Sequence, residues 1–371
     1  MERQMKKTMR TAFATTLLAF SLSAAQAAAP ERTECIAPAK PGGGFDLTCK
    51  LIQVSLQETG QITTPMRVTY MPGGVGAVAY NAIIAQRPAE AGTLVAFSGG
   101  SLLNLSQGKF GRYSVDDVKW LAAIGTDYGM VAVRADAPWK TLGELLEAMK
   151  NDPTKVVVGA GASIGSQDWM KTALLAREAG IDPRKMRYVA FEGGGEPVTA
   201  LLGNHIQVVS GDMSEMVPHL QGGKMRVLAV MSDKRLPGEL ADIPTAKEQG
   251  FNVEWPIIRG YYLGPKVSDA DYQWWEQTFK KLVTTKEFQQ QRDLRGLFEF
   301  NLFGSELDAY VKKQLRAGWS TPFPAAAARS DGDLRGDDAA AQAGRRTVAG
   351  GGNAEKAAGA VRDADGVRLA V

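Results

Sequence analysis

The feature that most constrains the fold is a unit that recurs along the chain: a short β-branched run, a loop rich in glycine or serine, and an amphipathic helix. Strands that alternate with helices of this length predict parallel, doubly wound sheets. One example is the run 155–158, which leads into a loop and then a helix over about 168–179 that ends at Gly180. Ligands of such sheets bind beyond the carboxyl ends of the strands, where these loops are expected to lie.

Two helix starts are marked by side chains that can cap the backbone. Thr141 with Glu144, and Thr245 with Glu248, fit the capping box, in which a hydroxyl and a carboxylate satisfy each other's backbone donors. These pairs are structural signals and predict no function.

The first glycine-rich loop, "KPGGGFD" at 40–46, lies between a predicted strand and a predicted helix. It lacks the lysine and the hydroxyl that a P-loop carries after its last glycine, so it does not predict a nucleotide site. Free backbone N–H groups and the positive end of a helix dipole favour a carboxylate or phosphate, and glycine lets such a ligand approach closely. We therefore expect this loop to hold a small acid. A glycine that serves only the turn is the alternative for any single loop.

The first 27 residues indicate export. A basic start is followed by an apolar run too short to span a bilayer, and Ala25-Gln26-Ala27 supplies the small residues that signal peptidase accepts. We expect a cleaved signal peptide over 1–27 and a periplasmic mature chain that starts near Ala28. A retained membrane anchor is the alternative.

Length and charge narrow the class of protein. The 371 residues suffice for two domains, and the net charge of +3 with scattered lysines and arginines does not favour a nucleic-acid partner.

The cysteines, Cys35 and Cys49, lie on either side of the glycine loop, and an oxidising compartment favours a disulfide between them over two free thiols. Two cysteines and two histidines lack zinc-type spacing, so neither a metal nor another cofactor is expected.

The composition changes abruptly after about Trp319. Residues 321–371 have almost no large apolar side chains and are dominated by Ala, Gly, Asp and Arg. Such a segment cannot bury enough surface to offset its ordering entropy, so we expect a disordered tail. Its abrupt onset suggests a reading-frame change.

One motif is typical of an enzyme. Gly161-Ala162-Ser163-Ile164-Gly165 matches the nucleophile elbow of α/β-hydrolases, and His205 or His219 could supply the base on chain order. No HGGG-type oxyanion loop precedes Ser163, and other loops carry similar glycine clusters without a nucleophile. A serine hydrolase that uses Ser163 is therefore the alternative to a non-enzymatic binding protein.

Several stretches together resemble one family. They are "CIAPAKPGGGFD", "MPGGVG", "GASIGSQD", "FEGGGEPVTALLG" and "GGKMRVLAVMSDKRLPGELADIPTAKEQG". They are similar to the substrate-binding component of tripartite tricarboxylate transporters, the TctC or Bug family of periplasmic receptors, over residues 30–319. The resemblance implies a monomer that binds a small, citrate-like di- or tricarboxylate between two lobes and delivers it to integral-membrane permease subunits. A sensory receptor of the same fold is a further alternative.

The fold that the resemblance implies is a two-lobed periplasmic-binding-protein clamshell of type II, with each lobe a mainly parallel sheet flanked by helices. Lobe 1 would hold residues 30–130 and 254–320, and lobe 2 residues 131–253. The implied ligand-binding residues are Gly42, Gly43, Gly44, Phe45, Asp46, Gly73, Gly74, Ser98 and Ser101 in lobe 1, and Ser163, Gly165, Ser166, Gly193, Gly194, Gly195 and Asp212 in lobe 2.

This chain departs from the family at three positions. Lys40 stands where the family often has a small residue, and Asp168 or Asn104 stands where it has a histidine. Lys40 lies at the end of a predicted strand, so its ammonium could compensate a second carboxylate of the ligand, because an unpaired buried charge is very costly. The hypothesis is that Lys40 sets a preference for acids with several carboxylates; a solvated lysine is the alternative.

Overall fold

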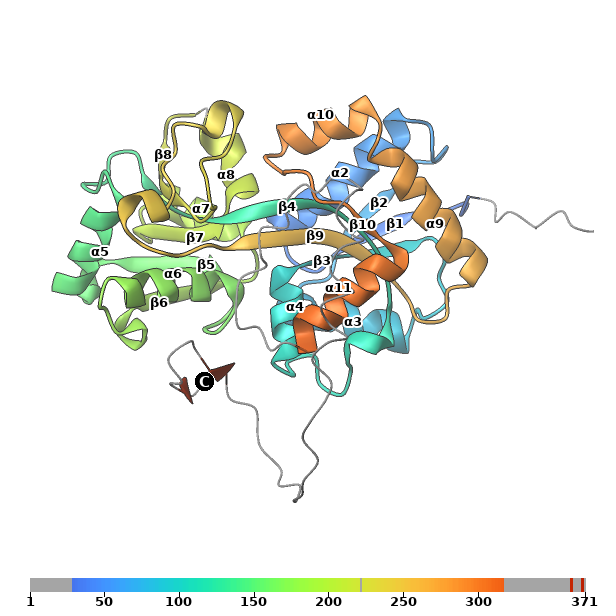
Figure 1. The fold of residues 1–371 in the computed structure, drawn as a ribbon, viewed down its shortest axis with the longest axis horizontal. Helices are drawn as coiled ribbons and strands as arrows, with labels where there is room; N and C mark the ends of the chain where they lie inside the picture. Colours follow the sequence, from blue (N-terminus) through green and yellow to red (C-terminus); the bar gives the residue numbers. More distant parts are fainter. Residues whose placement is uncertain (1–28, 221, 317–360, 363–367, 370–371) are drawn as a thin grey trace, which may run out of the picture.

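One long strand, β4 (Lys119–Arg134), runs through both halves of the molecule and joins them (Figure 1). The computed structural model describes residues 29–220, 222–316, 361–362 and 368–369. Residues 119–128 of β4 pair antiparallel with β9 (Pro256–Leu263), and residues 129–134 pair with strands of the other half. The chain therefore forms two lobes that share one continuous sheet.

Lobe 1 is built on strands in the order β2-β1-β3-β9-β4. The first three are parallel, as the repeated strand–helix unit predicts, whereas β9 is antiparallel to both of its neighbours. The strands are β1 (Glu34–Ala37), β2 (Arg67–Tyr70), β3 (Thr93–Ser98) and the short β10 (Leu302–Phe303). The helices are α2 (Gly44–Glu58), α3 (Ala77–Ala85), α4 (Gly99–Ser106), α9 (Asp269–Leu282), α10 (Lys286–Leu294) and α11 (Gly304–Arg316).

Lobe 2 repeats this plan. Strands β5, β6 and β7 are parallel, whereas β4 is antiparallel to β7 and to β8. The strands are β5 (Val157–Gly161), β6 (Arg187–Phe191), β7 (Val208–Asp212) and β8 (Met225–Val230). The helices are α5 (Leu142–Asn151), α6 (Gln167–Glu178), α7 (Gly195–Leu202) and α8 (Met213–Leu220).

The sheet is therefore mixed, and each lobe keeps three parallel strands beside the antiparallel crossing strands. Single-turn helices complete the described chain: η1 (Gly74–Gly76), η2 (Val115–Asp117), η3 (Pro153–Lys155), η4 (Pro183–Lys185), η5 (Gly238–Leu240) and η6 (Lys247–Gln249). Within the tail, β11 (Val361–Arg362) pairs antiparallel with β12 (Arg368–Leu369). The expected signal peptide and most of the expected disordered tail lie outside the described residues.

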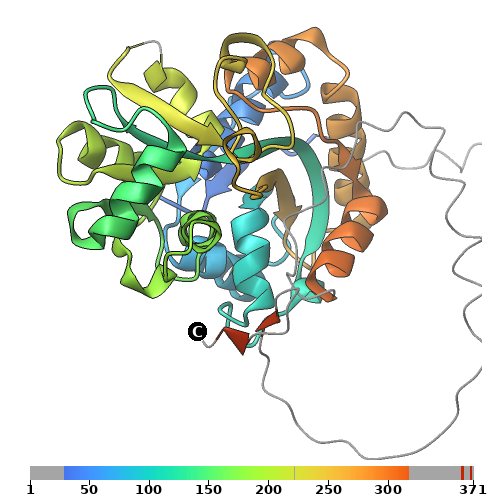
Figure 2. The same cartoon turned by 60° about the vertical axis from the view of Figure 1, so that its left-hand side comes forward.

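Apolar clusters pack on both faces of the sheet in each lobe, under the helices that Figure 2 shows around the curled β4. Trp120, Trp275 and Phe279 are among the largest fully buried side chains of lobe 1. Burial of a large apolar side chain contributes about 1.5 to 3 kcal/mol, so these cores make each lobe a firm support for its loops.

The predicted disulfide is confirmed. Cys35 in β1 and Cys49 in α2 are bridged, their Cα atoms lie 5.5 Å apart, and both side chains are fully buried. The bridge fastens the first strand to the helix that follows the glycine loop, so it supports that loop from both ends.

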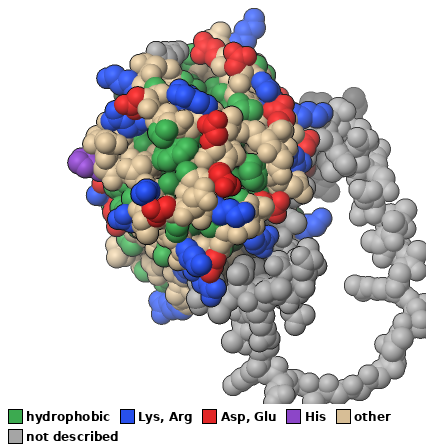
Figure 3. All heavy atoms as spheres, turned by 90° about the vertical axis from the view of Figure 1, so that its left-hand side faces the viewer, with side chains coloured by type: hydrophobic (Ala, Val, Ile, Leu, Met, Phe, Trp, Pro, Cys, Tyr) green, Lys and Arg blue, Asp and Glu red, His purple; other side chains and the backbone are tan. Residues whose placement is uncertain are grey.

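The end face of lobe 2 carries lysines, arginines and acidic side chains in mixture around a small apolar area (Figure 3). Within the described part of the chain, every helix is too short or too polar to cross a bilayer.

Candidate functional site

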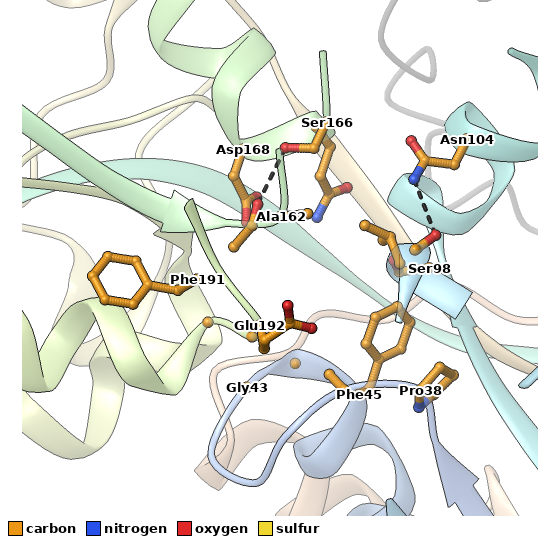
Figure 4. Close-up of a pocket in the computed structure, with 18 of the residues that line it drawn as sticks. Pro38, Gly43, Phe45, Ser98, Asn104, Ala162, Ser166, Asp168, Phe191 and Glu192 are labelled. Atoms are coloured by element: carbon orange, nitrogen blue, oxygen red, sulfur yellow. Dashed lines mark hydrogen bonds between the residues drawn. The ribbon is translucent and has the colours of Figure 1, made fainter. Parts of the chain in front are cut away.

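A cavity of about 310 Å³ lies between the two lobes, and both lobes line it. Lobe 1 contributes the loops after β1, β2 and β3, and lobe 2 contributes the loops after β5, β6 and β7. Figure 4 shows Ser98 and Asn104 of lobe 1 on one side and Ser166 and Asp168 of lobe 2 on the other. The carboxyl ends of both sets of parallel strands therefore meet at this cavity, where the fold class predicts a ligand.

The structure brings most of the predicted site residues together. Those that line the cavity are Gly43, Gly44, Phe45, Gly73, Gly74, Ser98, Ser163, Ser166, Gly193, Gly194 and Asp212. They come from six separate loops, which shows that the glycine and serine clusters mark one common space.

Six predicted residues lie beside the cavity without lining it: Lys40, Gly42, Asp46, Ser101, Gly165 and Gly195. The Asp46 carboxylate is occupied locally, because it accepts hydrogen bonds from the Gly42 N–H at 2.8 Å and the Tyr70 hydroxyl at 2.9 Å. The Ser101 hydroxyl takes part in the cap of α4 and accepts from the Ser98 N–H at 3.4 Å. These residues shape the loops around the cavity.

Lys40 does not face the cavity either. Its Nζ lies 2.8 Å from Oε1 of Glu196 in the other lobe, and both side chains are substantially exposed. The structure therefore places the Lys40 ammonium in an ion pair between the lobes, where a carboxylate of the protein already compensates its charge.

The two lobes are in contact across the cleft. Gly43 and Gly194 approach so closely that a Cβ on Gly43 would lie 2.9 Å from the Gly194 nitrogen. Gln107 donates from Nε2 to the Gly165 carbonyl at 3.4 Å, also between the lobes. Glycine at position 43 therefore allows the lobes to approach this closely, because any side chain there would clash with the backbone of the facing lobe.

Five helices begin at residues that line the cavity or directly follow them: α2, α4, α6, α7 and α8. The first backbone N–H groups of a helix have no partner within it, and the helix dipole places partial positive charge at this end. Helix ends of this kind, combined with glycine loops, favour negatively charged groups.

A buried network of charged side chains lies against the cavity, and three of its members line it: Asp168, Asp212 and Arg259. Nη2 of Arg259, on β9, lies 2.7 Å from Oδ2 of Asp127 and 2.5 Å from Oδ2 of Asp212. Nζ of Lys171, on α6, contacts Oδ1 of Asp168 at 2.7 Å and also pairs with Asp212. These five side chains are almost wholly buried.

The network shifts the pKa values of its members in different directions. Burial raises the pKa of Asp127 and of Asp168, although Arg259 and Lys171 oppose this effect. The pKa of Lys171 is raised: burial alone would lower it, but the carboxylates of Asp168 and Asp212 outweigh that effect. The pKa of Asp212 is lowered, because Lys171 and Arg259 outweigh the cost of burial. Asp212 is therefore the carboxylate that the two cations stabilise most directly.

Glu215 behaves differently. Burial first, and then the nearby Asp212 and Asp168, raise the pKa of this carboxyl to about 8. Its Oε1 accepts a hydrogen bond from the Gly44 N–H at 2.8 Å, and its Oε2 accepts from the Asp212 N–H at 3.2 Å. At neutral pH the group is thus largely protonated, and it occupies the helix N-terminus where the sequence predicts a ligand acid.

Several of these residues were missed by sequence reasoning. Asp127 and Arg259 are charged residues inside otherwise apolar strands, which is a signal that could have identified them. Lys109, Gln167 and Glu215 also line the cavity, yet nothing in their local sequence separates them from surface residues.

The Ser163 hydroxyl lines the cavity as well. A serine nucleophile of the hydrolase type needs a histidine within hydrogen-bond reach. Neither His205 nor His219 is among the described residues that line this space, so the geometry does not support the hydrolase alternative.

Two α/β lobes that share crossing strands and close over a lined cavity define a solute-binding receptor of the periplasmic-binding-protein class. The model of the tripartite tricarboxylate transporter family receptor matches residues 53–304 of the chain. The chain therefore belongs to this family, as the resemblance in its sequence predicts.

Individual members and solved structures have low sequence identity to this chain. A UPF0065 protein of Cupriavidus necator is 28% identical over 178 residues, which are 47% of this chain and 52% of that protein, so the chain spans about half the length of this relative. The periplasmic binding protein BugD superposes with a TM-score of 0.70 at 20% identity, over 78% of this chain and 96% of BugD. MatC of Rhodopseudomonas palustris with bound malate superposes with a TM-score of 0.67 at 19% identity, over 77% and 97%. These structures confirm the two-lobed clamshell fold.

Proposed function

We propose that this protein is a periplasmic solute receptor that closes on a small carboxylate and delivers it to the membrane permease of a tripartite tricarboxylate transporter. The observation that carries the proposal is the convergence of five helix N-termini, from both lobes, on one closed cavity. Such an arrangement binds an anion and couples its binding to closure, because the ligand contacts both lobes only when they meet. Membership of the receptor family and the malate bound by MatC support the ligand class.

Two features support an exported protein. The N-terminal pattern of basic, apolar and small residues is typical of a secretory signal, although residues 1–28 lie outside the described chain. The buried disulfide between Cys35 and Cys49 suits an oxidising compartment. The periplasm is therefore the location that we propose.

The number of carboxylates on the ligand stays a prediction. The citrate-like ligand expected from the family would bring several negative charges into a cavity that already contains Asp168, Glu192 and Asp212. Since Lys40 is paired with Glu196, it offers no free charge to a second carboxylate. The five helix N-termini offset part of this negative charge, so the expected di- or tricarboxylate stays the prediction that the ligand screen tests.

Thermal unfolding of the purified protein with mono-, di- and tricarboxylates tests this function. A ligand at 100 times its Kd should raise the free energy of unfolding by about 2.7 kcal/mol. Calorimetry would then give the affinity of each acid that stabilises. Failure of every carboxylate to bind would contradict the proposed function. Uptake of the best ligand by cells with and without this protein would test delivery to the permease.

A further inference from the structure

The side chain of Glu215 reaches from one lobe to the other. Glu215 lies in the first turn of α8 in lobe 2, and α8 contacts α2 of lobe 1 across the division between the lobes (Figure 1). Its Oε1 accepts the 2.8 Å hydrogen bond from the Gly44 N–H of lobe 1, and its Oε2 accepts from the Asp212 N–H of its own lobe. The bond to Gly44 therefore exists only when the lobes meet.

Glycines of both lobes make room for this carboxyl group. A Cβ on Gly211 would lie 3.0 Å from its Oε2, and a Cβ on Gly43 would lie 3.4 Å from its Oε1. The side chain of Glu215 lines the cavity, yet the residue is only 7% exposed. Closure of the lobes therefore removes Glu215 from water, and separation of the lobes would return it to water.

The cations nearest to Glu215 are already paired with other carboxylates. Arg259 of β9 pairs with Asp127 of β4 and Asp212 of β7. Lys171 of α6 pairs with Asp212 as well. Among the described residues, no lysine or arginine forms an ion pair with Glu215. An ionised carboxylate that is buried without such a partner is costly, so the closed arrangement favours the neutral acid at this position.

The other charged and titratable groups around Glu215 do not reverse this preference. Burial, followed by Asp212 and Asp168, raises the pKa of Glu215 to about 8, against the opposing effect of the two paired cations. Exposure to water in an open arrangement would bring this pKa back towards its ordinary value of 4.5. The packed elements also carry Asp46 and Lys50 on α2, which pair with each other, Glu192 and Glu196 at the start of α7, and His219 one turn further along α8.

We infer that closure of the lobes takes up a proton at Glu215, so the receptor binds its acid together with this proton. The inference rests on the proposed receptor function and specifies how that site is regulated. Since the closed arrangement binds more protons than the open one, closure is favoured at low pH and weakens as pH rises. A ligand carboxylate in the same cavity reinforces this effect, because it would repel an ionised Glu215.

Linkage of one proton gives the size of the effect. Where the open arrangement has lost the proton and the closed one has kept it, each pH unit changes the closure equilibrium by about tenfold. The affinity for ligand follows this equilibrium, because the ligand contacts both lobes only in the closed arrangement. Most of the change should fall at and below about pH 8, where the closed arrangement still holds the proton.

Calorimetry at pH 7 and pH 9 tests the inference, with malate and succinate as probes because both acids are almost fully ionised at these pH values. The affinity of the wild type should fall about tenfold from pH 7 to pH 9. In Glu215→Gln, which cannot ionise at this position, it should fall less than about threefold. Lys109, which lines the cavity, and His219 are retained in this variant, so the difference between the two proteins isolates Glu215. Equal falls in both proteins would overturn the inference.

Glu178→Gln, at the exposed end of α6, is the matched control and should follow the wild type. Melting temperatures of the unliganded variants would show that each of them is folded. Calorimetry of the wild type at pH 7 in buffers of different ionisation enthalpy counts protons without any substitution. Binding should take up close to one proton per ligand. No proton uptake by the wild type would also overturn the inference.

Failure of the proposed function is a separate outcome. If no carboxylate of any kind binds at either pH, the receptor function fails, and small-angle scattering of the ligand-free protein then decides the inference. The wild type should be more compact at pH 7 than at pH 9, because closure itself takes up the proton, and Glu215→Gln should scatter alike at both. Identical scattering of the wild type at the two pH values would in that case overturn the inference as well.

Discussion

The backbone N–H of Gly44, in the first turn of α2, donates a 2.8 Å hydrogen bond to Oε1 of Glu215 in the other lobe. A carboxyl group of the protein thus occupies the glycine-rich helix start that the sequence predicts as a cradle for a small acid. A Cβ on Gly194 would lie 2.0 Å from the same Glu215 oxygen, so the glycine loops of both lobes enclose it. The contact links the closed arrangement of the lobes to the protonation state of one side chain.

The first prediction concerns pH. Burial and the nearby carboxylates raise the pKa of Glu215 from its ordinary value of 4.5 to about 8. For a group whose pKa is raised by folding, the stabilising contribution is present below the unfolded value and is lost as pH rises through the folded value. The wild-type protein should therefore lose about 2 to 5 kcal/mol of unfolding free energy through this group between pH 5 and pH 9.

The variant Glu215→Gln keeps the shape of the side chain and cannot ionise, so it should lack this part of the pH dependence. Denaturant unfolding at several pH values measures the effect, and Glu239→Gln, at an exposed glutamate, is the matched control. Identical pH profiles for the wild type and Glu215→Gln would contradict the prediction.

The second prediction concerns closure. In Gly43→Ala the new Cβ would lie 2.9 Å from the Gly194 nitrogen, closer than real Cβ atoms approach backbone. Because apparent affinity falls with the fraction of protein that can close, ligand should bind about tenfold more weakly or worse. Calorimetry gives the affinity, and small-angle scattering reports whether ligand still compacts the protein.

A suitable control for closure is Gly143→Ala in α5. A Cβ there has only one neighbour within 4 Å, the Thr141 hydroxyl at 3.9 Å. Alanine also has a higher helix propensity than glycine, so this variant should fold normally and bind ligand as the wild type does. Wild-type affinity in Gly43→Ala would show that the lobes need not meet at this point.

The third prediction concerns Lys40 and revises the hypothesis that it selects acids with several carboxylates. Lys40 pairs with Glu196 at an exposed edge between the lobes, and exposed ion pairs contribute little. Lys40→Met should therefore weaken mono- and tricarboxylates by the same small factor, less than about threefold. Calorimetry on Lys40→Met, Glu196→Gln and the double variant forms the test. A selective loss of tricarboxylate binding would restore the original hypothesis.

The fourth prediction concerns the disulfide between Cys35 and Cys49, which are 14 positions apart. A loop of this size should contribute about 3 kcal/mol to the free energy of unfolding, because the bridge restricts the unfolded chain. The Cys35→Ala, Cys49→Ala double variant should be less stable by about this amount, and a reducing agent should lower the stability of the wild type alone. Equal sensitivity of both proteins to reductant would contradict this account.

The sequence by itself determined the features that depend on neighbouring residues or on backbone chemistry. The alternation of strands and glycine loops predicted the parallel strands and the cavity at their ends, because this periodicity is local. The capping pairs formed as expected: Thr141 Oγ1 accepts from the Glu144 N–H at 3.2 Å, and Thr245 Oγ1 accepts from the Glu248 N–H at 3.0 Å. The disulfide followed from two cysteines that lie on either side of one glycine-rich loop in the sequence.

Only the tertiary structure decided which charges meet. Asp127 and Arg259 are 132 positions apart, and they pair because β4 and β9 run side by side in the sheet. The pairs of Gly44 with Glu215 and of Lys40 with Glu196 exist because the two lobes close on each other. A pattern of residues indicates whether a segment forms a helix or a strand and which chemical groups a loop carries. It does not indicate which residue of a distant segment will contact them. The charge balance of the cavity, and with it the chemistry of the ligand, therefore depends on contacts that form only when the whole chain is folded.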